Sequence, residues 1–125
     1  MTTIIKYSLS HEWIQINEKK ATVGITEYAR KELGEIVYVE LPVVGSKISF
    51  GEEVVVLEST KAAADIYSPS SGEVIEVNTL LQSDLTSLNN DPEGKGWLFK
   101  MTFSGVKEEE SLLLDRKQYE EMVKG

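Results

Sequence analysis

A series of short apolar runs, rich in β-branched and aromatic residues, restricts the fold of this chain more than any other feature. Residues 36–41 read IVYVEL and are followed by Pro42, residues 54–57 read VVVL, and residues 74–77 read VIEV. Such residues favour strands because their side chains pack well on a pleated, half-buried surface. The runs therefore predict a chain that is mainly β.

Two other segments fit the same interpretation. Residues 11–16 hold several apolar side chains and are followed by the polar turn NEKK and then by ATVGI, which predicts a hairpin. A loop of turn formers at residues 89–96 leads into another strand. The side chains that alternate along one face of that strand are Trp97, Phe99, Met101 and Phe103.

Helical signals are short and lie beside the β-type runs. Thr26 can cap a helix that Gly34 ends, and Asp115 with Gln118 resembles a capping box near the C-terminus. The apolar residues at helical spacing are Ala29 and Leu33 in the first helix, and Tyr119, Met122 and Val123 in the second. Because no low-complexity linker interrupts these elements, residues 1–125 are expected to form a single domain.

Composition narrows the classes of function. The 13 basic and 21 acidic side chains give a formal net charge of -8, which would repel a phosphate backbone. Nucleic acid is therefore not an expected partner, and the charge can serve either encounter with basic faces of other proteins or solubility alone.

The absence of cysteine excludes disulfides, thiolate metal sites and cysteine nucleophiles. His11 is the only histidine, so a zinc site with several imidazole ligands cannot form. A non-catalytic protein is favoured on these grounds. No apolar run is long enough to span a membrane and residues 1–6 lack a signal core, so we expect a soluble, cytoplasmic protein.

Lys61 is the candidate for covalent modification. It lies where the apolar run at residues 54–57 gives way to a second strand through Ile66 and Tyr67, and this position predicts a turn. A lysine that another enzyme acylates must project from the fold and have small neighbours. Its small neighbours are Ser59, Thr60, Ala62 and Ala63. A lysine on a turn is by itself more often an ordinary solvated residue.

The sequence around Lys61 and several other segments resemble the glycine cleavage H proteins. The matching segments are SHEW at residues 10–13, GITEYA at 24–29, LGEIVYVELP at 33–42, ESTKAAADIYSP at 58–69, GEV at 72–74, Asn89 with Pro92, and GWL at 96–98. They follow the order of the family and extend over nearly the whole chain.

The chain departs from the family pattern at a few positions. Thr60 replaces a common valine and Ala64 a frequent serine, while Glu93 stands where a tyrosine often follows the proline. Residues 85–88 replace a segment that contains proline. Thr60 is β-branched like valine and should keep the turn, but the changes at residues 85–88 and 93 could alter how a partner enzyme docks.

The resemblance implies a lipoyl/biotinyl-type flattened β-barrel, or barrel-sandwich hybrid, with short peripheral helices and a C-terminal helix. It implies lipoate attached to Lys61, with Glu58, Ser59 and Ala62 around the attachment point. The lipoyl group would receive the aminomethyl intermediate from glycine decarboxylase (P protein), pass it to aminomethyltransferase (T protein), and be reoxidised by dihydrolipoyl dehydrogenase (L protein). A lipoate-attaching enzyme is a fourth partner, and the carrier is expected to be a monomer that catalyses nothing itself.

The resemblance also implies a cleft that shelters the loaded arm. Its residues would be Ser10, Glu12, Ile25 and Asp65. A carboxylate such as Glu12 or Asp65 can pair with the cationic amine, and Ile25 can cover the hydrocarbon of the arm.

Three alternatives remain open from the sequence. A biotin acceptor presents its lysine on a similar hairpin, although methionines usually flank that lysine and Thr60 and Ala62 flank this one. An H-like protein could relay lipoyl groups to other enzymes or serve another lipoate-dependent pathway. A free-standing enzyme could use His11 with Glu12 as an acid and base pair.

Overall fold

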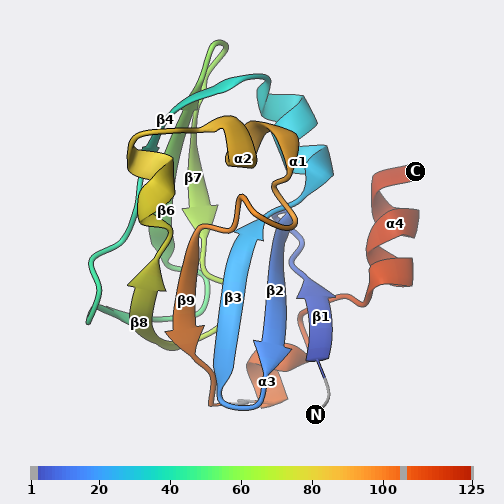
Figure 1. The fold of residues 1–125 in the computed structure, drawn as a ribbon. Coiled ribbons are helices and arrows are strands. Elements are labelled where there is room, and N and C mark those ends of the chain that lie inside the picture. Colours follow the sequence, from blue (N-terminus) through green and yellow to red (C-terminus); the bar gives the residue numbers. More distant parts are fainter. Residues whose placement is uncertain (1–2, 105–106, 125) are drawn as a thin grey trace.

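The computed structural model describes residues 3–104 and 107–124, which form two antiparallel sheets and a few short helices (Figure 1). The larger sheet has the order β1-β2-β3-β9-β8-β5, and the smaller one has the order β4-β6-β7. The strands of the larger sheet are β1 (Thr3–Tyr7), β2 (Glu12–Asn17), β3 (Lys20–Ile25), β9 (Phe99–Thr102), β8 (Gly72–Val77) and β5 (Lys47–Ile48). Those of the smaller sheet are β4 (Ile36–Glu40), β6 (Glu53–Ser59) and β7 (Ala63–Tyr67).

The main core lies between the two sheets. Side chains alternate across a strand, so one face of each sheet can be apolar throughout. Ile14, Val23 and Phe99 come from the larger sheet, Leu57 and Ile66 come from the smaller one, and all five are buried in one cluster. The chain is therefore mainly β, as predicted, with the architecture of a sandwich. Within the described residues, the two sheets do not close into a complete barrel.

The first predicted helix is confirmed as α1 (Glu27–Leu33). The Thr26 hydroxyl accepts a hydrogen bond from the Ala29 N–H at 3.2 Å, and Gly34 ends the helix at φ +86°. A left-handed φ is available to glycine without steric cost, which explains the stop at this residue. The helix places Gly34 and the following Glu35 directly before β4.

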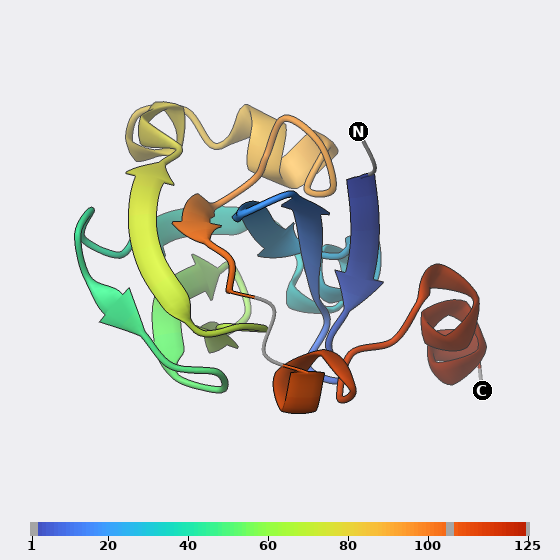
Figure 2. The ribbon, with the colours of Figure 1, turned by 90° about the horizontal axis from the view of Figure 1, so that it is seen from below.

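The C-terminal helix α4 (Arg116–Lys124) lies beside the edge strand β1 of the larger sheet, where Tyr119 packs in a small cluster with Tyr7 and Trp13 (Figure 2). Its predicted capping box forms: the Asp115 N–H donates to the Gln118 Oε1 at 2.9 Å, and the Gln118 N–H donates to the Asp115 Oδ1 at 2.8 Å. Tyr119 is buried and stacks on Tyr7, with ring centroids 4.8 Å apart. Met122, which the sequence places at helical spacing from Tyr119, is exposed.

Several elements differ from the prediction. Asn89 and Asn90, expected in a loop, end the helix α2 (Thr86–Asn90), and β1 was not predicted. The 3-10 helix η1 (Thr79–Gln82) and the short helix α3 (Lys107–Glu110) were not predicted either. Trp97 lies before β9 and packs beside the Tyr7 cluster, so it does not share a face with Phe99. Among the residues described, no helix is both long and apolar enough to cross a membrane.

Candidate functional site: a lysine hairpin and a buried carboxylate

Lys61 lies in the tight turn that joins β6 to β7, at the projecting tip of the hairpin (Figure 1). The Ser59 Oγ accepts hydrogen bonds from the N–H groups of Lys61 and Ala62, both at 3.1 Å. The Ser59 N–H donates to the Ala62 carbonyl oxygen at 2.8 Å. A serine side chain thus organises the backbone of the turn. Lys61 and Ala62 are both exposed.

The turn is also attached to the corner between α1 and β4. The Thr60 N–H donates to the Glu35 carbonyl oxygen at 3.0 Å. The aliphatic part of Lys61 lies over Gly34, because a Cβ built on Gly34 would stand 3.3 Å from the Lys61 Cε. The base of the lysine is therefore fixed. Glu58, the residue before Ser59, is exposed on β6.

Glu12, the first residue of β2, is 1% exposed and binds several groups. Its Oε1 accepts hydrogen bonds from the Ser8 Oγ at 2.5 Å and from the Ser10 Oγ at 2.6 Å. Its Oε2 accepts from the Tyr67 N–H, the last residue of β7, at 3.3 Å. A buried carboxylate that accepts three hydrogen bonds has a fixed orientation.

Burial and hydrogen bonding act on this carboxyl in opposite directions. Burial raises the pKa of Glu12 above its ordinary value, because a charged group loses its hydration there. The hydrogen bonds from Ser10, Ser8 and the Tyr67 N–H lower the pKa, but their effect is smaller. The site therefore favours a proton or another cationic partner near Glu12.

A cavity of about 290 Å³ opens beside this carboxylate. Its lining is mostly apolar and includes Phe50, Tyr67, Pro69 and Leu113, while Glu12 and the serines at positions 8, 10 and 68 supply the polar side chains. An apolar hollow with one carboxylate can receive a hydrocarbon chain that ends in an amine.

The strand β7 joins the lysine turn to this cavity. From Ala63 to Tyr67 it makes four steps, or about 13 Å at the usual rise of a strand. Asp65 is exposed and lies on the same side of β7 as Tyr67. Ile25 lies opposite Glu12 in the pairing of β2 with β3, and it is completely buried in the core. Of the four predicted cleft residues, Ser10 and Glu12 line the cavity, whereas Ile25 lies in the core behind the strand pair and Asp65 lies on β7 two residues before the lining residue Tyr67.

His11 and Glu12 bind different partners although they are adjacent in sequence. The His11 Nδ1 lies 2.9 Å from the Tyr119 hydroxyl oxygen, and its ring centroid lies 4.7 Å from that of Tyr28. Burial lowers the pKa of His11, and the nearby Glu32 carboxylate opposes this shift. The Glu12 carboxylate is directed to serine hydroxyls and a backbone N–H. The geometry does not form an acid and base pair from these two residues.

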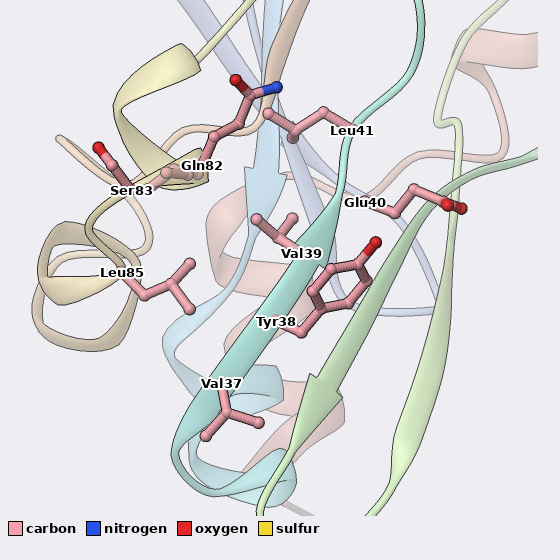
Figure 3. Close-up of a pocket in the computed structure, with 9 residues that line it drawn as sticks. Val37, Tyr38, Val39, Glu40, Leu41, Gln82, Ser83 and Leu85 are labelled. Atoms are coloured by element: carbon pink, nitrogen blue, oxygen red, sulfur yellow. The ribbon is translucent and has the colours of Figure 1, made fainter.

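A separate hollow of about 520 Å³ runs along the edge strand β4 (Figure 3). Val39 and Leu85 point into the gap between β4 and the segment that follows η1, whereas Tyr38 and Glu40 point away from that gap. It does not include Lys61 or Glu12. We therefore place the candidate site at the hairpin and the smaller cavity.

Some residues of the site were not identified from the sequence. Ser8 is buried and both donates to Glu12 and accepts its N–H, and Gly34 lies under Lys61. Phe50 and Leu113 reach the cavity from distant parts of the chain. The sequence holds one local indication of these contacts, the close spacing of Ser8, Ser10 and Glu12. This spacing predicts hydrogen bonds to the carboxylate only if the chain is known to turn between these residues.

Comparisons with known proteins agree with this arrangement. The family described as "Glycine cleavage H-protein" matches residues 5–125 of the chain. A "Glycine cleavage system H protein" of Thermotoga maritima is 52% identical over 116 residues, which cover 93% of each protein. A "Probable glycine cleavage system H protein 1" of Sulfolobus acidocaldarius is 54% identical over 113 residues, covering 90% of this chain and 81% of the relative.

The fold is also similar to a solved structure. The crystal structure of a glycine cleavage system H protein from Mycobacterium marinum superposes with a TM-score of 0.88. The two chains are 35% identical, and the match covers 100% of each. Sequence and fold thus agree along the whole chain. It belongs to the glycine cleavage H-protein family, the lipoyl-bearing carriers of the glycine cleavage system.

Proposed function

We propose that this chain carries lipoate in amide linkage on Lys61 and delivers it to the other proteins of the glycine cleavage system. The observation that carries this proposal is the position of Lys61 on a fixed, exposed hairpin tip with small neighbours. A modifying enzyme can close over such a lysine, because Thr60 and Ala62 present little bulk. Family membership supports the identity of the attached group.

Bound lipoate supplies a dithiolane that can accept an aminomethyl group at glycine decarboxylase, release it at aminomethyltransferase, and be reoxidised at dihydrolipoyl dehydrogenase. The protein itself holds the lipoyl group where the active sites of the partner enzymes can reach it. A tethered group reaches millimolar effective concentration in a docked active site without a separate diffusion step. The acidic surface of the carrier would favour encounter with basic faces of these partners.

Between transfers, the chain would hold the loaded arm against its own surface. In the proposed arrangement, Glu12 and Asp65 offer carboxylates to the cationic amine, and Ser10 helps to fix the Glu12 carboxylate. Ile25, which pairs with Glu12 across β2 and β3, is buried in the core and would act only as packing behind that carboxylate. The buried position of Glu12 favours a cationic partner, because the carboxylate has lost most of its contact with water.

The attachment is tested by intact mass and peptide mapping after incubation with a lipoate-attaching enzyme. We expect a single lipoyl mass gain on the peptide that contains Lys61. Lys61→Arg should abolish the gain, whereas Lys47→Arg, at an exposed lysine of β5, should leave it unchanged. A biotin mass, or no gain on wild-type protein, would contradict the proposal.

The delivery step is tested by reconstitution. Lipoylated protein mixed with the three partner enzymes should release carbon dioxide from glycine, and Lys61→Arg should not. If the lipoylated protein supports no release, a relay of lipoyl groups to other enzymes becomes the better interpretation. Sedimentation of the lipoylated protein tests the expected monomer.

A further inference from the structure

The hydroxyl of Tyr119 connects the C-terminal helix to the residue that precedes β2 and to the residue that follows β3. It lies 2.6 Å from the Thr26 Oγ1 and 2.9 Å from the His11 Nδ1. Thr26 directly follows Ile25, and His11 directly precedes Glu12. Tyr119 comes from α4, more than ninety residues later in the chain. One phenol therefore contacts the residues next to two members of the proposed cleft.

The backbone at His11 needs such support. His11 has φ +73°, a left-handed conformation that is unfavourable for a residue with a Cβ. This conformation closes the turn between Ser8 and Glu12, in which the His11 N–H donates to the Ser8 carbonyl oxygen at 3.2 Å and the Ser8 N–H donates to the Glu12 carbonyl oxygen at 2.9 Å. The turn brings the Ser8 and Ser10 hydroxyls onto one oxygen of Glu12.

The His11 ring is held from two sides. The Tyr119 hydroxyl meets its Nδ1, and Tyr28 lies against its face. The His11 carbonyl oxygen accepts a hydrogen bond from the Thr26 N–H at 3.1 Å, so the turn and the start of α1 are also joined through the backbone. Loss of the phenol hydroxyl would remove the side-chain hydrogen bond that links His11 to α4.

We propose that Tyr119 is a positioning residue of the cleft: its hydroxyl fixes the His11 turn and thereby the direction of the Glu12 carboxylate. This role of Tyr119 rests on the proposed function, because the cleft that Tyr119 positions is the surface proposed to shelter the loaded arm. Tyr119 is not proposed to touch the arm. It acts through His11 and Thr26.

The test compares two variants that each lose one phenol hydroxyl from the same stacked pair. Tyr119→Phe removes the contacts to His11 and Thr26, whereas Tyr7→Phe removes the hydrogen bond that the Arg116 guanidinium donates to the Tyr7 hydroxyl at 2.6 Å. Both variants keep the stacked rings and a link between α4 and the sheet. NMR spectra of the unlipoylated proteins report the backbone amides of the Ser8–Glu12 turn and the ring of His11.

The second measurement uses lipoylated protein loaded with an aminomethyl group. Water attack on this adduct returns the thiol and releases formaldehyde and ammonia. The rate of formaldehyde release therefore measures how well the protein protects the adduct from water. We expect Tyr119→Phe to shift the amides of the turn and to speed release roughly fivefold, the effect of about one neutral hydrogen bond. Tyr7→Phe should change release by less than about twofold, because its bond lies outside the turn.

The outcomes separate the two proposals. If Tyr119→Phe leaves the turn amides in place, or if both variants release formaldehyde equally fast, the role of Tyr119 is overturned. If loaded wild-type protein releases formaldehyde as fast as loaded free lipoamide, the sheltering cleft of the proposed function is overturned. The NMR spectra then still decide whether Tyr119 fixes the turn.

Discussion

The side chain of Lys61 lies on Gly34, a glycine at which a Cβ would stand 3.3 Å from the Lys61 Cε. Gly34 has φ +86° and ψ -160°, a backbone conformation that is nearly restricted to glycine. Gly34 thus ends α1 and also leaves room for the Lys61 side chain. Its effect on stability and its effect on the lysine can be distinguished by comparing alanine substitutions at two glycines.

Gly34→Ala is expected to lower the free energy of unfolding by about 1 to 3 kcal/mol, because alanine is strained in this conformation. It should also slow lipoylation of Lys61, since the new methyl group pushes the lysine stem away. Gly45→Ala is the matched control, because Gly45 has φ +94° but no neighbour within 4 Å of the added methyl group. It should lose stability with no change in the lipoylation rate. Equal lipoylation of both variants, measured by mass spectrometry, would show that the Gly34 contact is unimportant.

Glu12→Gln tests the buried carboxyl through the pH dependence of stability. The folded pKa of Glu12 is raised above its ordinary value of 4.5, so the folded state holds this proton more tightly than the unfolded state. The stabilisation by neutral Glu12 is complete below pH 4.5 and is lost as pH rises through the folded pKa. Urea unfolding from pH 4.5 to 8 should therefore show the variant gaining stability relative to wild type as pH rises. A difference that does not change with pH would contradict the raised pKa.

His11 gives the opposite dependence on pH. Its folded pKa is lowered below 6.5, so the unfolded state binds the proton first and stability falls as pH drops from 6.5 through the folded pKa. Because the chain has a single histidine, its ring protons can be assigned without ambiguity, and we expect their NMR titration midpoint below 6.5. His11→Asn should remove this acid sensitivity and still tolerate the left-handed backbone. A midpoint at or above 6.5 would refute the shift.

Asn89→Ala tests the contact that begins β4. The Asn89 Oδ1 accepts the Ile36 N–H at 2.8 Å, and its Nδ2 donates to the Ile36 carbonyl oxygen at 3.0 Å. Ile36 is buried, so its backbone groups would lose their partner, and we expect a loss of about 2 kcal/mol in unfolding free energy. Asn90→Ala, at the exposed neighbouring position, should change stability by less than about 0.5 kcal/mol. Similar losses in chemical denaturation would argue against the special role of Asn89.

Local signals in the sequence were sufficient for the hairpin at residues 12–25, helix α1 and the capping box of α4. Each depends on residues within a few positions of one another, as in the pairing of the Asp115 and Gln118 side chains and backbones. The turn at Lys61 was also predicted, because small residues there follow a strongly apolar run. Such features are determined by near neighbours in the chain.

Features that depend on distant contacts could not be predicted. The Tyr67 N–H donates to the Glu12 carboxylate, which lies 55 positions earlier in the sequence. The Asn89 side-chain amide hydrogen-bonds the backbone N–H and carbonyl oxygen of Ile36, as a neighbouring strand would. Asn89 looked like part of a loop because asparagine favours turns, whereas its tertiary hydrogen bonds stabilise a helix end. β1 was missed for a related reason: its pairing with β2 determines it, although Ile4 and Ile5 remain exposed.

The strand β7 acts as a spacer of fixed length between the acceptor lysine and the Glu12 carboxylate. A two-residue insertion would keep its alternation of faces but move Lys61 about 7 Å farther from Tyr67. A one-residue insertion would exchange the faces of Asp65 and Ile66, sending a carboxylate into the core and a core side chain to the surface. The hairpin can therefore be grafted or redesigned only as a unit of constant length, whereas its tip sequence can change more freely.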